Sequence, residues 1–536
     1  MNFKKYFILV VVAAFALTAC DTDKLVIEQQ GVLTTSEYTT ADDDGVDAFI
    51  AAIYSYIHGD SYLTFAGTSS TATWGYMKFY LNQMAKDTSD EFGYSEGAEG
   101  STYSQIWSYC YTIIYWCNMV IENLPDNNTA STSKITTAVA ECRAIRAIMM
   151  SYLVQLYGTP PLADHIMDGT EGNTPADESW AWIETELEEA AEDLPTKSGL
   201  GGQSTIGGRM TKEAAYAYLG RAQLWQGNYS DAATTLYNKV ISTGKYALND
   251  NWSDLNLSTT SDFTDENIWE FDFNEDTASA QGQAGCMDLI IFAPAVTYWW
   301  STYASLYMAW GQGSHPNQDY IDLIVAHDGT DSDRYNAQIL DVCTASTMGG
   351  VSNPTSGCMG YFSVRHLCRD EDCVGVLPYW YSLKNTVFMR YAEVLLNYAE
   401  AVCQGGSSGS GLSGLEALNL VRNRAGLDDA PSLSMDNETY GIKAERRIEL
   451  YTEGQRFIDL VRWGDAATEL ADCGLYTYTC TLGGSMEVSG ITIYTTFEVS
   501  ESSTGNSGFK SGKNELFPIP QSDLNQNSNL TQNTGW

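Results

Sequence analysis

The sequence predicts a mostly α-helical protein in which helix pairs build a scaffold and a loop-rich lobe carries a few short strands. Apolar residues recur at intervals of three and four along much of the chain, as at Tyr391, Val394 and Leu395, which is the period of an amphipathic helix. Breaks such as GTPP and GG separate these stretches. Two long stretches, about 245–385 and 473–515, lack the helical period but are rich in aromatic residues and cysteines, so we expect them to be ordered.

The helical pattern divides into separate segments along the chain. Helices are predicted at residues 45–58, 103–124, 134–158, 177–193, 211–226, 229–243, 386–404, 412–425, 437–452 and 455–471. Short strands are expected at 267–273 and 491–499, where β-branched and aromatic residues collect. The resulting organisation has a helical part at 41–244, a loop-rich part at 245–385, a second helical part at 386–472 and an irregular segment at 473–536.

One helix pair, 211–226 with 229–243, follows the residue spacing of a tetratricopeptide unit. The small residues Gly220 and Ala232 allow two antiparallel helices to approach closely, and Gly227 ends the first helix. Less regular pairs are expected from 386–404 with 412–425 and from 134–158 with 177–193. Stacked pairs of this kind form one continuous core and a concave face, but they do not specify a function by themselves.

Charged residues of opposite sign alternate at helical spacing in the second helical part. They are Glu445, Arg446, Arg447, Glu449, Glu453, Arg456, Asp459 and Arg462. Arg390, Arg422 and Arg424 on neighbouring predicted helices are natural partners. We therefore expect ion-pair networks that fix helix packing rather than a ligand site. Pro518 and Pro520 favour an extended terminal segment that lies across the helices.

The N-terminal residues predict an exported, lipid-anchored protein. Lys4 and Lys5 precede a run of about a dozen apolar residues, which is too short to span a bilayer and is typical of a secretory signal. The sequence LTAC that ends at Cys20 resembles a bacterial lipobox. We expect a signal peptide at 1–19, acylation of Cys20 and a tether over 20–40, because two or more acyl chains hold a protein stably on a membrane.

Composition excludes several classes of partner and cofactor. The chain has 68 acidic against 28 basic residues, and this negative field repels nucleic acid and polyanionic glycans. The twelve cysteines show no CxxC spacing, so we expect no zinc framework, while a Cys473–Cys480 disulfide stays open. Acidic loops at 41–45 and 328–333 are of a kind that can hold Ca²⁺, but solvated turns and helix caps also explain them. We expect no cofactor and leave Ca²⁺ open.

Several segments together resemble the SusD/RagB family of nutrient-binding outer-membrane lipoproteins. The similar segments are 104–125, 142–162, 388–402, 417–427, 442–464 and the ending 516–536, and they occur in the family's order. The resemblance runs from the lipobox to Trp536 and weakens through 245–385. It implies a helical tetratricopeptide-like lobe that packs on a SusC-like, TonB-dependent barrel, and a loop-rich lobe that binds ligand, usually an oligosaccharide. Asp21 and Asp23 resemble the surface-export signal of such lipoproteins.

The stretch TYWWSTYASLYMAW at 297–310 concentrates aromatic residues in the region where the resemblance is weakest. A membrane contact is disfavoured because 280–320 contains no Lys or Arg. Trp299, Tyr303 and Trp310 fall on one helical stripe, which suits a core helix. Trp300 and Tyr307 lie beside that stripe, where an aromatic ring can cover the apolar face of a sugar.

The candidates for ligand contact are Trp300, Tyr307, Trp310, Trp74, Tyr76, Tyr379 and Trp380, all in segments expected to be irregular. No nucleophile elbow, metal site or placed pair of carboxylates indicates an enzyme, so we expect no catalysis. The alternatives are a surface glycosidase, a peptide-binding member of the same scaffold, or an adaptor that uses its helical surface for protein partners only.

Overall fold

The computed structural model describes residues 35–58, 74–88, 91–197, 208–272, 316–341, 361–363, 365, 384–484, 486–488, 491–493 and 496–536. Its longer helices are α3 (Asp43–His58), α5 (Trp74–Met84), α6 (Ser101–Asn123), α7 (Thr132–Tyr157), α8 (Ala176–Asp193), α9 (Lys212–Trp225), α14 (Gln318–His327), α16 (Tyr391–Cys403), α17 (Gly414–Arg424), α18 (Ile442–Glu449) and α19 (Arg456–Trp463). The shorter ones are α2 (Thr35–Thr40), α10 (Tyr229–Thr235), α11 (Ser258–Ser261), α15 (Asp333–Gln338), α20 (Ala466–Glu469) and α21 (Gln521–Gln526).

The strands among the described residues form two-stranded antiparallel sheets. The pairs are β1 (Asn267–Phe271) with β4 (Thr386–Arg390), β2 (Ile339–Asp341) with β3 (Tyr361–Ser363), β5 (Tyr476–Gly483) with β8 (Thr496–Ser503), and β6 (Met486–Val488) with β7 (Ile491–Ile493). In the register of β1 with β4, Trp269 lies opposite Met389. This small sheet therefore joins the two helical parts of the chain.

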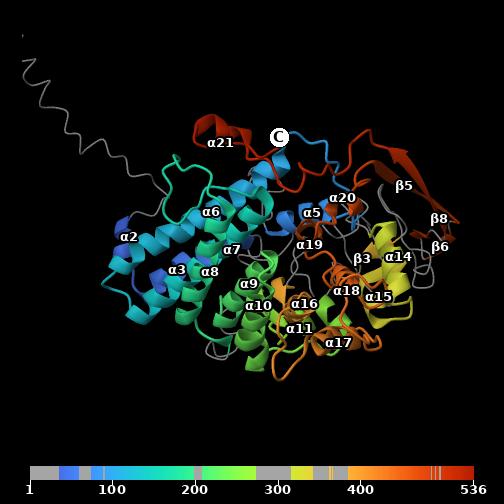
Figure 1. Cartoon of the computed structure of the whole chain (residues 1–536), viewed down its shortest axis with the longest axis horizontal. Coiled ribbons are helices and arrows are strands. Elements are labelled where there is room, and N and C mark those ends of the chain that lie inside the picture. The colour runs from blue at the N-terminus through green and yellow to red at the C-terminus, as the bar shows by residue number, and fades with distance from the viewer. Residues whose placement is uncertain are drawn as a thin grey trace, which may run out of the picture.

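Successive helices stack side by side, as Figure 1 shows from α6 through α10. Helix α7 packs between α6 and α8, α8 against α9, and α9 against α10. Helix α16 continues the row by packing on both α10 and α17, although it follows α10 by more than 150 residues. The predicted helix-pair scaffold is confirmed, and its units share one continuous core because each helix buries faces against two neighbours.

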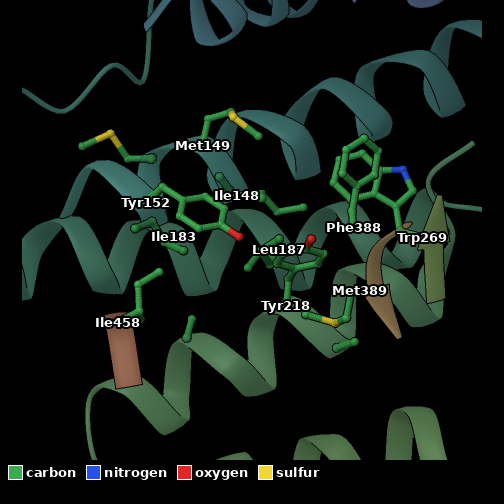
Figure 2. Close-up of a cluster of buried hydrophobic side chains, with 14 of the residues drawn as sticks. Ile148, Met149, Tyr152, Ile183, Leu187, Tyr218, Trp269, Phe388, Met389 and Ile458 are labelled. Atoms are coloured by element: carbon green, nitrogen blue, oxygen red, sulfur yellow. The ribbon is translucent and has the colours of Figure 1, made fainter. Parts of the chain in front are cut away.

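The main core lies where the long helices meet the small sheet. Figure 2 shows Tyr152 of α7, Leu187 of α8, Tyr218 of α9, Trp269 of β1 and Phe388 of β4 in one cluster. The ring centroids of Trp269 and Phe388 are 4.3 Å apart. The packing of these large rings therefore holds the small sheet in addition to its backbone hydrogen bonds.

A second, smaller core holds α14, α15 and β2 on the rest of the molecule. Tyr320 of α14 stacks on Tyr451 with ring centroids 3.9 Å apart, and Ile448 of α18 packs beside them. The helices α14 and α15 were not predicted, since the region 245–385 was expected to be loops with short strands. Both begin with a residue whose side chain caps the helix, namely Asn317 and Ser332.

Some predicted helix bounds are wrong for identifiable reasons. The predicted helix 386–404 begins as β4, because its first residues pair with β1, and becomes α16 only at Tyr391. Helix α18 starts at Ile442 and not at 437, because the Asn437 side chain accepts from backbone N–H groups of the next residues and holds a turn. The predicted helix 455–471 breaks at Gly464, whose φ of 78° is left-handed.

Other segments are more regular than the sequence predicts. Residues 74–84 form α5, and the segment 473–515, predicted as irregular apart from one strand, contains β5 to β8. The predicted strand 491–499 divides into β7 and β8. Of the predicted tether over 20–40, the structure describes 35–40, which form α2, and Tyr38 there is buried against Phe49 with ring centroids 4.5 Å apart.

The predicted ion-pair network is confirmed and is deeply buried. Arg390 binds Glu266, Glu449 and Glu453, with nitrogen–oxygen distances of 2.6, 3.0 and 2.6 Å. Burial alone would raise the pKa of Glu449, but the guanidinium groups of Arg424, Arg390 and Arg334 outweigh it and lower that pKa to about 2. The sequence missed Arg334 and Glu266, which reach the network from the loop-rich part.

Two further expectations concern the cysteines and the end of the chain. Cys473 is a buried free thiol that contacts backbone oxygens, so the Cys473–Cys480 disulfide left open by the sequence does not form. The extended terminal segment is confirmed: the Phe517 N–H donates to the Leu156 carbonyl, and the Trp536 indole donates to the Leu516 carbonyl.

None of the described helices is long and apolar enough to cross a membrane.

Candidate functional site

Most residues predicted to contact ligand lie outside the described part of the chain. These are Trp300, Tyr307, Trp310, Tyr379 and Trp380, together with the predicted lipidation site Cys20. Their roles therefore stay predictions.

Trp74 and Tyr76 lie in the described part of the chain, and they differ in how far they are buried. Trp74 has 2% of its surface exposed, and its ring meets Tyr152 and Phe388 edge to face at 5.5 and 4.7 Å. The prediction of Trp74 as an exposed ligand contact is wrong, because α5 carries this ring into the main core. Tyr76 is half-buried and stacks on Tyr80 at 6.0 Å, which leaves it a candidate.

The described residues that flank the two aromatic-rich segments are tied to the scaffold. Pro316 bridges to Thr88, and the Asn317 side chain donates to Glu91. On the other segment, the Lys384 ammonium donates to the Arg365 carbonyl at 2.9 Å, bringing the two flanks of 366–383 together. Arg365 in turn donates to the Tyr451 carbonyl and pairs with Glu453 of the buried network.

Glu91 lies at the attachment point of Asn317, and the pKa of its carboxyl group is raised. Its carboxylate accepts from the Asn317 amide and, at 2.7 Å, from the Gly474 N–H. Burial raises the pKa of Glu91 to about 7, so this group is partly neutral near physiological pH. We therefore expect the junction between α14 and the β5–β8 ribbon to respond to pH.

The described structure also contains an open groove of about 650 Å³ along α6. Its floor is the aromatic stripe Trp107, Tyr111 and Tyr115, one helical turn apart on α6. One wall is the segment 161–171, and the other is the C-terminal segment 523–530. This volume falls in the range of about 300–1,000 Å³ that is typical of pockets that bind small molecules.

Hydrogen bonds fix both walls of the groove to α6, and the Asn527 amide of one wall donates to the Glu171 carbonyl of the other at 2.7 Å. The Trp107 indole donates to Asp523 at 3.2 Å, and the Tyr111 hydroxyl donates to the Pro161 carbonyl at 2.7 Å. Asn118 donates to the carbonyls of Ala163 and His165. The groove is thus a built feature with rigid walls, held by side chains that are partly or fully buried.

Sequence reasoning missed this groove. Aromatic residues at positions 107, 111 and 115 have helical spacing, which is usual for a core stripe, and the walls come from segments more than 350 residues apart. Tyr115 belongs to the same row but is 41% exposed, and this departure from a core stripe shows only in the structure.

Among the described residues, no group of three His, Cys, Asp or Glu side chains is arranged to hold a metal ion. In the loop 328–333, the Asp328 carboxylate instead accepts from Arg334 and lies against His327. In the loop 41–45, Asp42 accepts from the Gly45 N–H at the start of α3. Both described acidic loops thus have structural partners.

Two segments of the chain match models of known protein families. Residues 351–536 match the family model described as SusD family, and residues 42–224 match the model described as starch-binding associating with outer membrane. The chain belongs to the SusD family. This is a family of starch- and glycan-binding proteins associated with the outer membrane, and not a known enzyme family.

Relatives of this SusD-family protein agree with that assignment. A SusD-like protein of Bacteroides ovatus is 25% identical over 67% of this chain, and the match spans 65% of that relative's own length. SusD-like protein P2 of Formosa agariphila is 25% identical over 86% of this chain and 90% of its own.

Solved structures show the same architecture. A laminarin-binding SusD-like protein has a TM-score of 0.69 and 25% identity, over 92% of this chain and all of that one. Surface glycan-binding protein A from Bacteroides thetaiotaomicron, in complex with laminarihexaose, has a TM-score of 0.68 at 20% identity, over 92% of this chain and all of that one. The second likeness concerns the fold alone.

Proposed function

We propose that this protein is a cell-surface lipoprotein that binds an oligo- or polysaccharide and passes it to a SusC-like, TonB-dependent transporter in the outer membrane, without cleaving it. The observation that carries this proposal is the likeness to the laminarin-binding SusD-like protein along 92% of the chain. The net charge of −40 favours a neutral glycan over an acidic one, because like charges repel.

The ligand site of this proposal lies in the aromatic-rich segments. Trp300, Tyr307, Trp310, Tyr379 and Trp380 are its candidate contacts, and Tyr76 is the remaining candidate among the described residues. A sugar has apolar C–H faces that stack on such rings and hydroxyl groups that bind nearby amides and carboxylates. The tied flanks at Pro316 and Arg365 support this, since a binding segment needs a rigid base.

Paired measurements of stability and affinity test these candidates. Replacing Trp300 or Tyr307 by Ala should weaken glycan binding by roughly 1–3 kcal/mol and leave the melting temperature unchanged. Replacing Trp299 by Ala should instead lower stability by about 3–5 kcal/mol if that ring is packed inside. If the Trp300 and Tyr307 variants bind like the parent, the ligand site lies elsewhere.

The transporter partnership is tested in cells. An affinity tag on this chain should co-purify a TonB-dependent outer-membrane barrel, and deleting the chain should remove polysaccharide from the cell surface and slow its uptake. Uptake that proceeds unchanged without the chain would contradict a delivery role. Release of reducing ends from a bound polysaccharide, abolished by one Asp or Glu substitution, would contradict the absence of catalysis.

A further inference from the structure

The groove along α6 combines ring faces with a regular spacing. The α6 residues Trp107, Tyr111 and Tyr115 are separated by one turn each, a rise of about 6 Å per step. The rings of Trp107 and Tyr111 lie 4.8 Å apart at 55°, so they form a stepped floor rather than a flat stack. Trp107 is 4% exposed, so Tyr111 and Tyr115 are the rings of this row that two neighbouring sugar rings can meet.

The aromatic floor continues out of the groove onto the surface. Tyr115 contacts Trp116 with ring centroids 5.4 Å apart, and Trp116 contacts Tyr56 of α3 at 6.0 Å. Tyr56 and Tyr115 are 44% and 41% exposed. Trp116 and Tyr56 lie outside the groove lining, so the strip formed by Tyr111, Tyr115, Trp116 and Tyr56 extends beyond the groove.

The rim supplies acceptors that are already held in place. Asp523 accepts from the Trp107 indole through Oδ1 and from the Ser522 hydroxyl through Oδ2. Glu171 accepts from two backbone N–H groups of the segment 168–169. A carboxylate has about four lone-pair positions, so each of these groups keeps capacity to accept from a ligand hydroxyl.

The charge of the lining selects among polar ligands. Among the described residues that line the groove there is no Lys or Arg, whereas Asp168, Glu171 and Asp523 are all present. His165, the basic group there, already lies against Asp164 and Glu171 at 2.6 and 3.4 Å. A phosphate, sulfate or uronate would meet uncompensated negative charge, while a neutral sugar offers only hydroxyl donors and apolar faces.

From this geometry we propose that the α6 groove is a second glycan-binding site, which holds a short stretch of a neutral oligosaccharide on Tyr111 and Tyr115 and binds its hydroxyl groups with Glu171 and Asp523. The floor and walls of this site come from α6, 161–171 and 523–530, and none of the candidate contacts of the proposed function is among these residues. Two sites on one chain raise the retention of a long polymer through effective concentration, even when each site is weak.

The test uses the full chain in a background that lacks the proposed loop site. Trp300 and Tyr307 are both replaced by Ala, and the affinity for laminarihexaose, maltohexaose and trigalacturonate is measured by titration calorimetry. We expect residual binding of at least one neutral hexasaccharide and none of the acidic trisaccharide. Adding Tyr115→Ala should weaken the residual binding by about tenfold, whereas Tyr115→Phe should leave it within a few-fold, because Phe keeps the ring face.

Tyr476→Ala is the matched control, since Tyr476 is 38% exposed on β5 and lies outside the groove lining. Residual binding that Tyr115→Ala does not change, or a background with no residual binding while the parent chain binds sugar, would overturn the second site and leave the proposed function standing. A parent chain that binds none of the neutral probes would overturn both. If Tyr115→Ala spares sugar binding but prevents co-purification of the transporter, the groove is a protein surface and the proposal is wrong.

Discussion

Gly220 of α9 faces Leu236 so closely that a Cβ atom built at position 220 would lie 2.5 Å from the Leu236 side chain. Contacts below about 3 Å are not available to carbon atoms, so only glycine allows the two helices of this pair to approach as they do. The close approach expected from the tetratricopeptide spacing is thus confirmed at a single residue pair.

Gly220→Ala should destabilise the protein by about 1–3 kcal/mol through overpacking. Gly97→Ala is the control, because a Cβ atom there meets nothing within 4 Å. Chemical unfolding of both variants measures the difference. Combining Gly220→Ala with Leu236→Ala should cost less than the sum of the two single changes, and strict additivity would contradict the contact.

Arg390→Met should cost about 3–5 kcal/mol of unfolding free energy, because it leaves Glu266, Glu449 and Glu453 buried without their shared partner. Lys134→Ala removes a surface pair with Asp47 and should cost about 1 kcal/mol or less. Urea unfolding at one pH compares them. Equal costs would mean that burial does not determine how much these ion pairs contribute to the unfolding free energy.

The stability of the chain should fall as pH rises from about 4.5 toward about 7 through Glu91. Its folded pKa of about 7 lies above the ordinary value of 4.5, so the folded chain binds this proton more tightly than the unfolded chain. The contribution is complete below about 4.5 and is lost as the pH passes through the folded pKa.

Glu91→Gln tests this pH dependence, because the amide stays neutral and keeps an acceptor for the Gly474 N–H. At pH 8 the variant should be more stable than the parent by on the order of 1–3 kcal/mol, and at pH 4.5 the difference should vanish. The exposed Glu178→Gln is the control. A Glu91→Gln variant that is less stable than the parent at pH 8 would show that Glu91 works as an anion.

Cys20→Ala should release the protein from the membrane, because the predicted acyl chains would be what attaches it to the bilayer. Cell fractionation in a strain without the barrel partner measures this. A Cys20→Ala protein that still sediments with membranes there would refute the lipobox interpretation.

The helical scaffold was predictable because its signal is local. Helices α7 to α9 were found within a few residues, since apolar periodicity and breakers act within each segment. Strand β4 was missed because TVFMR continues an apolar pattern into α16, and only pairing with β1, over 100 residues away, makes it extended. Propensity yields to such tertiary contacts.

The sites were harder to predict for the same reason. Trp74 looked like an exposed ring in a polar stretch, and only the packing of Tyr152 and Phe388 around it shows that it is core. The α6 groove exists because Trp107 donates a hydrogen bond to Asp523, which lies 416 residues away in the sequence. No local pattern encodes such a contact. The sequence predicted the part of the buried network whose Arg and Glu residues lie in one helical region. It did not predict Arg334, which reaches Glu445 from α15.

The central claim is that this chain binds a neutral glycan, and the most direct measurement is the binding of the purified full chain to a panel of polysaccharides. Laminarin and starch represent the neutral class, and polygalacturonate represents the acidic class. The account predicts saturable binding to at least one neutral polysaccharide and none to polygalacturonate, as expected for a net charge of −40. Binding to the acidic polymer alone, or to no glycan of a broad panel, would contradict it.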